Sequence, residues 1–214
     1  MLWIPALKEI VDCIVAPFTG DNPATVIALS APGDALLSLG TSTTFLLSIP
    51  PADAPPKRFT TSHILSHPTA LGGQIAMLCY KNGALAREQV RDRYADGDWS
   101  RFNNLVEQTP PGNNGYVGLY FSLPEIIPPN VKGDFFFQTA ISNSTVVLVD
   151  DIPGYAHPRA ILESQFLSIR SRIAAILPEN APPLQRLVVT GGSSTNQTIR
   201  QLAAVGDPFF WLPL

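Results

Sequence analysis

Apolar residues cluster along the chain with spacings that predict both strands and helices. The apolar stretch 35–49 is interrupted by glycine and hydroxyl residues at 40–43, which predicts two strands joined by a tight turn. The stretch 72–80 predicts a buried strand, and 112–121 predicts a turn followed by a strand. Together these segments indicate a sheet of short, largely apolar strands.

Helices are predicted where apolar residues recur three and four positions apart. The clearest covers 158–177, with Pro158 at its first position and Pro178 blocking its continuation. The stretch 83–94 carries alternating charges on a helical pattern, and a further helix begins near Ser100. No repeat of fixed period is present, which excludes a solenoid.

The segment 186–197 combines a strand, a glycine turn and the start of a helix. Arg186 to Thr190 is a short apolar strand, and Gly191 and Gly192 turn the chain into a helix. A glycine pair lets a ligand approach the backbone, and free N–H groups at a helix start favour an anion. Because the GxGxxG fingerprint is absent, the pair also fits an ordinary tight turn, and both interpretations stay open.

The hairpin turn Gly40-Thr41-Ser42 is the second candidate for ligand binding. Backbone N–H groups and hydroxyls at such a turn can hold phosphate oxygens, although the same residues are common in ordinary hairpins. Two nucleotide signals on one chain strengthen each other, but neither is specific by itself.

Asp21 is the candidate for acid–base chemistry. It follows the apolar run 14–18, a predicted strand, and precedes a helix-like segment. A carboxylate at the carboxyl end of a strand can accept the proton of an attacking hydroxyl, as phosphoryl transfer requires. The alternative is that Asp21 or Asn22 caps the following helix, with Pro23 in its first turn, and spacing alone favours that alternative.

Composition narrows the class of protein. Of 214 residues, 45% are hydrophobic and 14% are charged, which excludes general disorder. The 14 Lys and Arg against 17 Asp and Glu give a net charge of -3 without a basic stripe, which argues against a nucleic-acid partner. The charged fraction lies below the usual ~25%, which indicates that part of the surface faces another domain.

The remaining signals predict a cytoplasmic protein without a metal site. Cys13 and Cys79 have no disulfide or metal spacing, which fits a reducing compartment. Charged residues interrupt the apolar start of the chain, and no run reaches the ~20 apolar residues of a membrane span. His63 and His67 are four apart but lie in a predicted loop, so a metal site is not expected. Trp99, at a helix start, could cap the helix or stack on a flat ligand.

The order of these motifs resembles the FGGY family of carbohydrate kinases, and within it especially the fungal xylulose kinases. Seven segments match in order and cover nearly the whole chain, which makes the resemblance specific. The matching strings are FTGDNPAT (18–25), SLGTSTTFLLS (38–48), CYKNGALARE (79–88), DWSRFN (98–103), NNGYVGLYF (113–121), RAILESQFLSIRSRI (159–173) and VVTGGSSTNQTIRQLAA (188–204).

The resemblance implies an α/β fold of the actin-like ATPase (ribonuclease H-like) type, with the active site in a cleft between two domains. Residues 1–32 would be the remnant of an N-terminal domain that carries the catalytic Asp. Residues 33–214 would be the C-terminal nucleotide-binding domain, shortened at its end, where GDPFFWLPL replaces an expected strand and closing helix.

The resemblance also implies a reaction, the ATP-dependent phosphorylation of D-xylulose to D-xylulose 5-phosphate. Asp21 would be the general base and Asn22 would contact the ketose, while Mg²⁺ would bridge the ATP phosphates without a metal ligand from the protein. The residues matched to ATP binding are Gly40, Thr41, Ser42, Trp99, Gly192, Ser193 and Asn196.

Two alternatives accompany this assignment. The chain could act on another ketopentose or a polyol, because the domain that would select the sugar is missing. It could also be an inactive nucleotide-binding fragment, which the low charged fraction supports. A complementary N-terminal domain or a homodimer is the implied protein partner.

Overall fold

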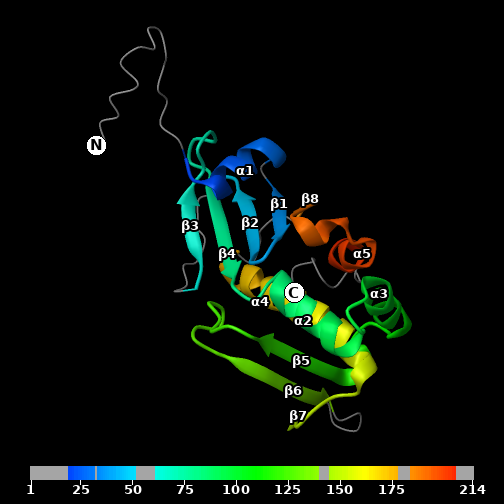
Figure 1. Ribbon diagram of the computed structural model, residues 1–214. Coiled ribbons are helices and arrows are strands. Elements are labelled where there is room, and N and C mark those ends of the chain that lie inside the picture. The colour runs from blue at the N-terminus through cyan, green and yellow to red at the C-terminus, as the bar shows by residue number, and fades with distance from the viewer. Residues whose placement is uncertain (1–18, 32, 52–60, 140–144, 178–183, 206–214) are drawn as a thin grey trace, which may run out of the picture.

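The computed structural model describes residues 19–31, 33–51, 61–139, 145–177 and 184–205. In these ranges the chain forms two sheets with helices packed between and beside them (Figure 1). The larger sheet has five strands in the order β3-β4-β2-β1-β8, and the smaller has three in the order β5-β6-β7. Among the described residues, no helix combines the length and the apolar character needed to cross a membrane.

The five-stranded sheet is built around the predicted hairpin. Its strands are β1 (Asp34–Leu39), β2 (Thr43–Ile49), β3 (His63–Ser66), β4 (Gln74–Tyr80) and β8 (Arg186–Thr190). β1 runs antiparallel to β2 and parallel to β8, so β1 is central and links the hairpin to the glycine turn that follows β8. The strand ends of β1 and β8 therefore lie at the same edge.

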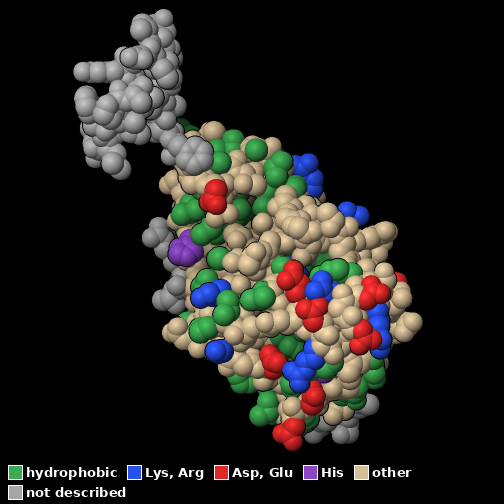
Figure 2. Space-filling view, viewed as in Figure 1, with side chains coloured by type: hydrophobic (Ala, Val, Ile, Leu, Met, Phe, Trp, Pro, Cys, Tyr) green, Lys and Arg blue, Asp and Glu red, His purple; other side chains and the backbone are tan. Residues whose placement is uncertain are grey.

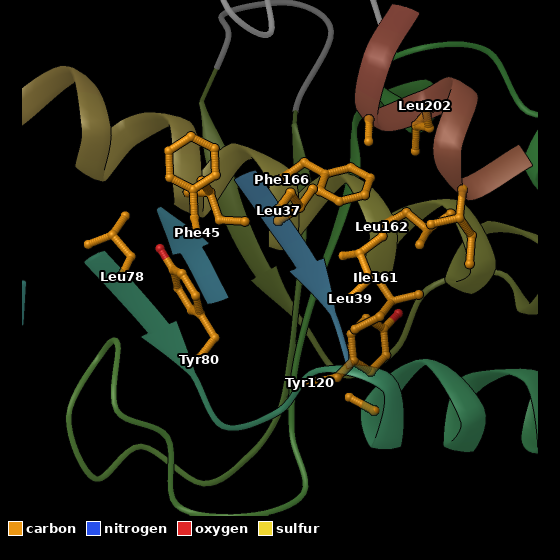
Figure 3. Packing of buried hydrophobic residues seen from close by; sticks show 14 of the residues in the cluster. Leu37, Leu39, Phe45, Leu78, Tyr80, Tyr120, Ile161, Leu162, Phe166 and Leu202 are labelled. Atoms are coloured by element: carbon orange, nitrogen blue, oxygen red, sulfur yellow. The ribbon is translucent and has the colours of Figure 1, made fainter. Parts of the chain in front are cut away.

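Each face of this sheet is covered by helix. On one face, Leu37 and Phe45 point toward Phe166 of α4 (His157–Ile176), and α2 (Ala84–Tyr94) packs beside α4 (Figures 1 and 3). On the other face, Val26 of α1 (Asp21–Leu29) packs against Leu36. Apolar residues alternate sides along a strand, which explains how β1 serves both cores.

The three-stranded sheet lies on the far side of α4 from the larger sheet. It consists of β5 (Tyr116–Phe121), β6 (Gly133–Thr139) and β7 (Val146–Val149), all antiparallel. Two further helices, α3 (Trp99–Gln108) and α5 (Gln197–Val205), pack against each other beside the sheets (Figure 1). The short helices are η2 (Asn113–Gly115), η3 (Gly154–Ala156) and η4 (Gly192–Thr195).

Most elements with a clear hydrophobic period are confirmed. The hairpin, β4, β8, the helix after Gly83 and the long helix all occur within one or two residues of the predicted bounds. The loop predicted around His63 is wrong, because His63–Ser66 forms the edge strand β3. A segment of four residues is too short for its hydrophobic pattern to identify it as a strand. Its backbone hydrogen bonds come from antiparallel pairing with β4. β6 and β7 were not predicted.

The charged side chains are mixed in sign over the helical face of the molecule. Figure 2 shows Asp and Glu interspersed with Lys and Arg over α2 and α3. Several of them pair, including Arg91 with Asp92 and Arg101 with Asp96. This part of the surface therefore carries no large field of one sign.

Candidate functional site

The tip of the β1–β2 hairpin meets the start of α2. The N–H of Gly83 donates to the carbonyl oxygen of Thr41 at 3.2 Å, and the N–H of Ala84 donates to that of Gly40 at 3.0 Å. The first turn of a helix has free N–H donors, and here two backbone N–H groups at the start of α2 hold the hairpin tip. Thr41 and Ser42 remain exposed.

Two glycines allow the backbones to come this close. A Cβ atom on Gly83 would lie 2.6 Å from the carbonyl oxygen of Thr41, and one on Gly191 would lie 2.8 Å from that of Leu39. Gly191 also has φ +86°, a conformation that favours glycine. The turn after β8 therefore packs directly on the end of β1, so the structure brings the 40–42 turn and the 191–193 turn together.

The 191–193 turn is open toward solvent at Gly191 and Gly192. Gly191 and Gly192 are exposed, and a Cβ atom on Gly192 would meet nothing within 4 Å. The chain then enters η4 and α5 through Asn196. The side-chain oxygen of Asn196 accepts from the N–H of Ile199 at 3.1 Å, and its amide nitrogen donates to Asn103 at 2.8 Å. Asn196 therefore fixes the turn to both α5 and α3.

Beneath the two turns lies a fully buried arginine that the sequence analysis did not single out. Arg87 of α2 is 0% exposed. One terminal nitrogen donates to the side-chain oxygen of Gln165 at 2.7 Å and, at 3.4 Å, to the hydroxyl of Thr43; the other donates to the hydroxyl of Ser193 at 3.1 Å. Burial lowers the pKa of Arg87 to about 10, against the opposing pull of Glu88, so the guanidinium remains charged at neutral pH.

A signal for Arg87 was available in the helical pattern. Arg87 follows the buried Ala86 and precedes the buried Val90 by three positions. Residues three apart lie on the same face of a helix, so Arg87 shares the buried face of α2 with Val90. A charged residue on an apolar stripe indicates a buried partner or a site. The alternating charges of the segment concealed this, because they favoured a solvated helix.

The predicted base lies away from the two turns. α1 packs near the end of the sheet at which β1 begins, whereas the 40–42 turn is at the end at which β1 finishes (Figure 1). Asp21 is the first residue of α1 and is exposed, and its carboxylate accepts from the N–H of Asn22 at 2.8 Å. The structure therefore does not join Asp21 and Asn22 to the glycine turns.

The capping interpretation of Asp21 is wrong in its geometry. The N-cap position of α1 is Gly20, which has extended backbone, and no side chain caps the helix. Asp21 instead lies in the first turn, where a negative charge complements the positive end of the helix dipole. The strand predicted over 14–18 lies outside the described residues.

Trp99 is part of the hydrophobic packing of α3. Its ring meets Phe102 edge-on at 5.1 Å between centroids, and the guanidinium of Arg91 lies 4.8 Å from the ring centre. The helix start is capped by Asp98, whose carboxylate accepts from the N–H of Ser100 at 2.7 Å. Trp99 is therefore not the cap, and its nucleotide contact stays a prediction.

A cavity of about 160 Å³ lies between α4 and β5, behind the hairpin. Thr43, Tyr80 and Gln165 are among the residues that line it. Burial raises the pKa of Tyr80 to about 12, partly offset by its hydrogen bond with Ser168, so the phenol stays neutral at physiological pH. Among the described residues, no group of three or more His, Cys, Asp or Glu side chains could hold a metal ion.

Comparison with known proteins defines the class. Residues 35–205 match the model of the FGGY family of carbohydrate kinases, C-terminal domain. That match covers more than half of the chain, so the chain belongs to the FGGY family, and the predicted α/β kinase fold is confirmed.

Within the family, the chain is similar to two curated fungal proteins of the same name. The chain is 41% identical over 216 residues to the probable D-xylulose kinase A of Arthroderma otae, covering 90% of this chain and 37% of that protein. It is 40% identical over 213 residues to the probable D-xylulose kinase A of Aspergillus terreus, covering 90% of this chain and 36% of that protein. The chain thus spans little more than a third of these relatives.

Solved structures agree with the fold. The xylulose kinase from Bifidobacterium adolescentis superposes with a TM-score of 0.67 at 27% identity, covering 88% of this chain and 35% of that one. Plasmodium falciparum glycerol kinase with ADP superposes with a TM-score of 0.60 at 14% identity, covering 86% of this chain and 36% of that one. The second likeness concerns the fold alone.

Proposed function

We propose that this chain is the nucleotide-binding part of a kinase that transfers phosphate from ATP to D-xylulose, giving D-xylulose 5-phosphate and ADP. The observation that carries the proposal is the contact between the 40–42 and 191–193 turns, which Gly191 makes possible. The names of the curated relatives, probable D-xylulose kinase A, supply the sugar.

The hairpin turn is suited to phosphate oxygens. Thr41 and Ser42 are exposed, and their N–H groups and hydroxyls lie at the tip of the turn. Gly83 and Ala84 are already used to hold the tip, so the phosphates would meet the hairpin itself rather than the start of α2. A rigid support of this kind positions the phosphates without a rearrangement at the moment of transfer.

The glycine turn is suited to the nucleoside end of ATP. Open space above Gly192 leaves room for a ligand against the backbone, and Ser193 follows directly. Asn196 holds this turn through its two side-chain hydrogen bonds, and its oxygen retains a second lone pair for a ligand hydroxyl. Trp99 would contribute at the margin of the pocket.

Asp21 is the proposed general base. As the terminal hydroxyl of the sugar forms a bond to the γ-phosphorus, the bond from that phosphorus to the ADP oxygen breaks, and the hydroxyl proton passes to the Asp21 carboxylate. Asn22 would orient the sugar. In this structure Asp21 lies at the opposite end of the sheet from the two turns, so the transfer requires that α1 be repositioned against the phosphates. Because the chain spans 37% of its relative, we propose that a complementary N-terminal domain places α1 there, supplies the other sugar contacts and closes the site over Asp21.

Mg²⁺ would enter with the nucleotide. Among the described residues no group of three or more His, Cys, Asp or Glu could hold a metal ion, so the ATP phosphates and water would supply most ligands of the ion. When bound, the ion neutralises phosphate charge; the residues of this chain bind and orient the phosphates.

Nucleotide binding is tested by thermal unfolding of the chain with and without Mg-ATP. A ligand that binds only the folded state must raise Tm, by an amount that grows with its concentration relative to Kd. ADP should also raise Tm and GTP less so, whereas no shift with any nucleotide would contradict the proposal.

Transfer is tested by sugar-dependent ADP release, with the relatives' N-terminal domain added as a separate chain. We expect Asp21→Asn to lower turnover by about 10²–10⁴-fold, the usual contribution of general-base catalysis. The same variant should keep the ATP-dependent rise in Tm. Undiminished turnover in Asp21→Asn would remove Asp21 from the mechanism, and turnover with a polyol but not D-xylulose would reassign the sugar.

A further inference from the structure

The guanidinium of Arg87 contacts residues next to both turns of the candidate site. Thr43 immediately follows the hairpin turn, and Ser193 immediately follows Gly192. Arg87 donates to both hydroxyls, through different terminal nitrogens. One side chain therefore spans from β2 to the turn after β8.

A third contact ties this link to α4. The side-chain oxygen of Gln165 accepts from Arg87 at 2.7 Å, and its amide nitrogen donates to the carbonyl oxygen of Asn82 at 2.8 Å. Asn82 precedes Gly83 in the segment that holds the hairpin tip. The three partners of Arg87 thus come from three separate elements, and each is neutral.

The charge of Arg87 has no counter-ion among the described ion pairs of the chain. Its Nε atom is buried and has no hydrogen-bond partner. Arg159, also buried, differs in this respect, because it pairs with the carboxylate of Glu163 at 2.6 Å. A buried cation without an anion is costly, and an anionic ligand nearby would offset that cost.

Direct contact between Arg87 and such a ligand is excluded by its burial. The side chain is 0% exposed, so it lies beneath the surface formed by the two turns. It can act on a bound ligand in two ways: through the positions of Thr43 and Ser193, and through its charge.

We propose that Arg87 is a positioning residue for the phosphate groups, an inference that rests on the nucleotide site proposed above. It fixes the spacing between the 40–42 and 191–193 turns, and it supplies positive charge below the place where the phosphates bind. The positive charge of Arg87 would attract the phosphates more strongly through the poorly solvated interior than it would through water.

The test compares two conservative variants of buried arginines, Arg87→Lys and Arg159→Lys, in the 214-residue chain. Lysine keeps the charge but cannot reproduce the fork of hydrogen bonds. Affinities for ATP and for adenosine are measured by displacement of a fluorescent ATP analogue. We expect Arg87→Lys to weaken ATP binding about tenfold, which corresponds to the loss of one or two hydrogen bonds from a charged donor.

Adenosine is the readout that separates positioning of phosphates from a structural role. Arg87→Lys and Arg87→Met should weaken adenosine binding much less than ATP binding, because adenosine would contact only the 191–193 turn and does not depend on the spacing between the two turns. Arg87→Met should lose more ATP affinity than Arg87→Lys because it also removes the charge. Arg159→Lys should lower Tm and leave both affinities unchanged. Equal losses for ATP and adenosine would overturn the inference.

Ser193→Ala keeps the inference falsifiable if Arg87→Met does not fold. This variant removes the half-buried hydroxyl of Ser193, which accepts a hydrogen bond from Arg87. We expect a threefold to tenfold loss of ATP affinity with a small change in Tm. In the double variant Ser193→Ala/Arg87→Lys the losses should be less than multiplicative, because both break one contact.

The outcomes are distinguishable from failure of the proposed function. If the unsubstituted chain binds ATP and Ser193→Ala and Arg87→Lys bind it equally well, the role of Arg87 is wrong and the nucleotide site stands. If the folded unsubstituted chain binds neither ATP nor adenosine, the nucleotide site is wrong and the role of Arg87 falls with it.

Discussion

Two regions along α4 differ in how their polar groups are arranged: the one around Arg87 near the middle of the helix, and the one around His157 at its start. At the hairpin, backbones meet through glycines, and the buried cation Arg87 forms none of the ion pairs of the described residues. At the three-stranded sheet, His157 is enclosed by Tyr94, stacked at 3.6 Å, and by the edges of Tyr120 and Phe136. In the first region the buried Nε of Arg87 has no hydrogen-bond partner among the described residues, whereas in the second both ring nitrogens of His157 are hydrogen-bonded and the hydroxyl of Tyr94 lacks a partner. The proposed ligand binding involves the first region, and the second is expected to contribute to stability.

The hydrogen bonds of His157 make this contrast concrete. Its Nε2 lies 3.1 Å from the carbonyl oxygen of Ile152, which can only accept, so Nε2 carries the proton. Its Nδ1 is therefore the acceptor for the hydroxyl of Tyr120 at 2.8 Å. Both ring nitrogens of a fully buried imidazole are satisfied in the neutral state, as a purely structural histidine requires.

The largest effect is expected where the backbones touch. Gly83→Ala would put a methyl group 2.6 Å from the oxygen of Thr41 and 2.7 Å from the nitrogen of Thr43, so the hairpin tip must move. We expect the free energy of unfolding to fall by about 3 kcal/mol. We also expect the ATP-dependent rise in Tm to be lost; calorimetry measures both quantities. Gly192→Ala is the control for stability alone, because its added methyl group meets no protein atom within 4 Å, although it would occupy the space proposed for the ligand. Equal stability of the two variants would contradict the packing described here.

A smaller effect is expected in the aromatic region. Tyr120→Phe removes the donor to Nδ1 of His157 and leaves that acceptor buried, which costs about 1–3 kcal/mol in unfolding free energy. The ATP-dependent rise in Tm should remain as in the unsubstituted chain, since Tyr120 lies in the other region. Denaturant unfolding with and without ATP measures both quantities, and a lost ATP response would break the division between the regions.

The smallest effect is expected from pH. Burial lowers the pKa of His157, with Asp151 acting in the opposite direction. As pH falls through about 6.5, the unfolded chain takes up a proton that folded His157 refuses, so stability decreases until the lower folded pKa is reached. Above pH 7 this contribution is complete. Tm between pH 7.5 and 5.5 should fall less steeply in His157→Gln than in the unsubstituted chain; parallel curves would contradict the assignment.

What the sequence predicts well is local. The helix 158–177 and the hairpin 35–49 have long, clear hydrophobic periods, and the two glycine turns follow directly from their flanking strands. The structure adds that the turns touch, because β1 and β8 pair in parallel and end at one edge. That pairing joins residues about 150 positions apart and has no local signature.

What the sequence misses depends on distant partners. β7 exposes Val146, Val147 and Leu148 on both of its faces, so it has no alternation to identify it. Arg87 shares a face of α2 with Val90, but the charges around it in the sequence favour a solvated helix, and its contacts with Gln165 and Ser193 establish that it is buried. Asp21 begins α1 itself, so the position of its carboxylate depends on how α1 packs rather than on capping.

The most direct test of the account is hydrogen exchange of the backbone amides with and without Mg-ATP. Binding should slow exchange at Thr41, Ser42 and Gly192 together, because the two turns form one site, while amides of the three-stranded sheet exchange at unchanged rates. Protection confined to β5–β7, or at one turn without the other, would contradict the claim that these turns form a single nucleotide site.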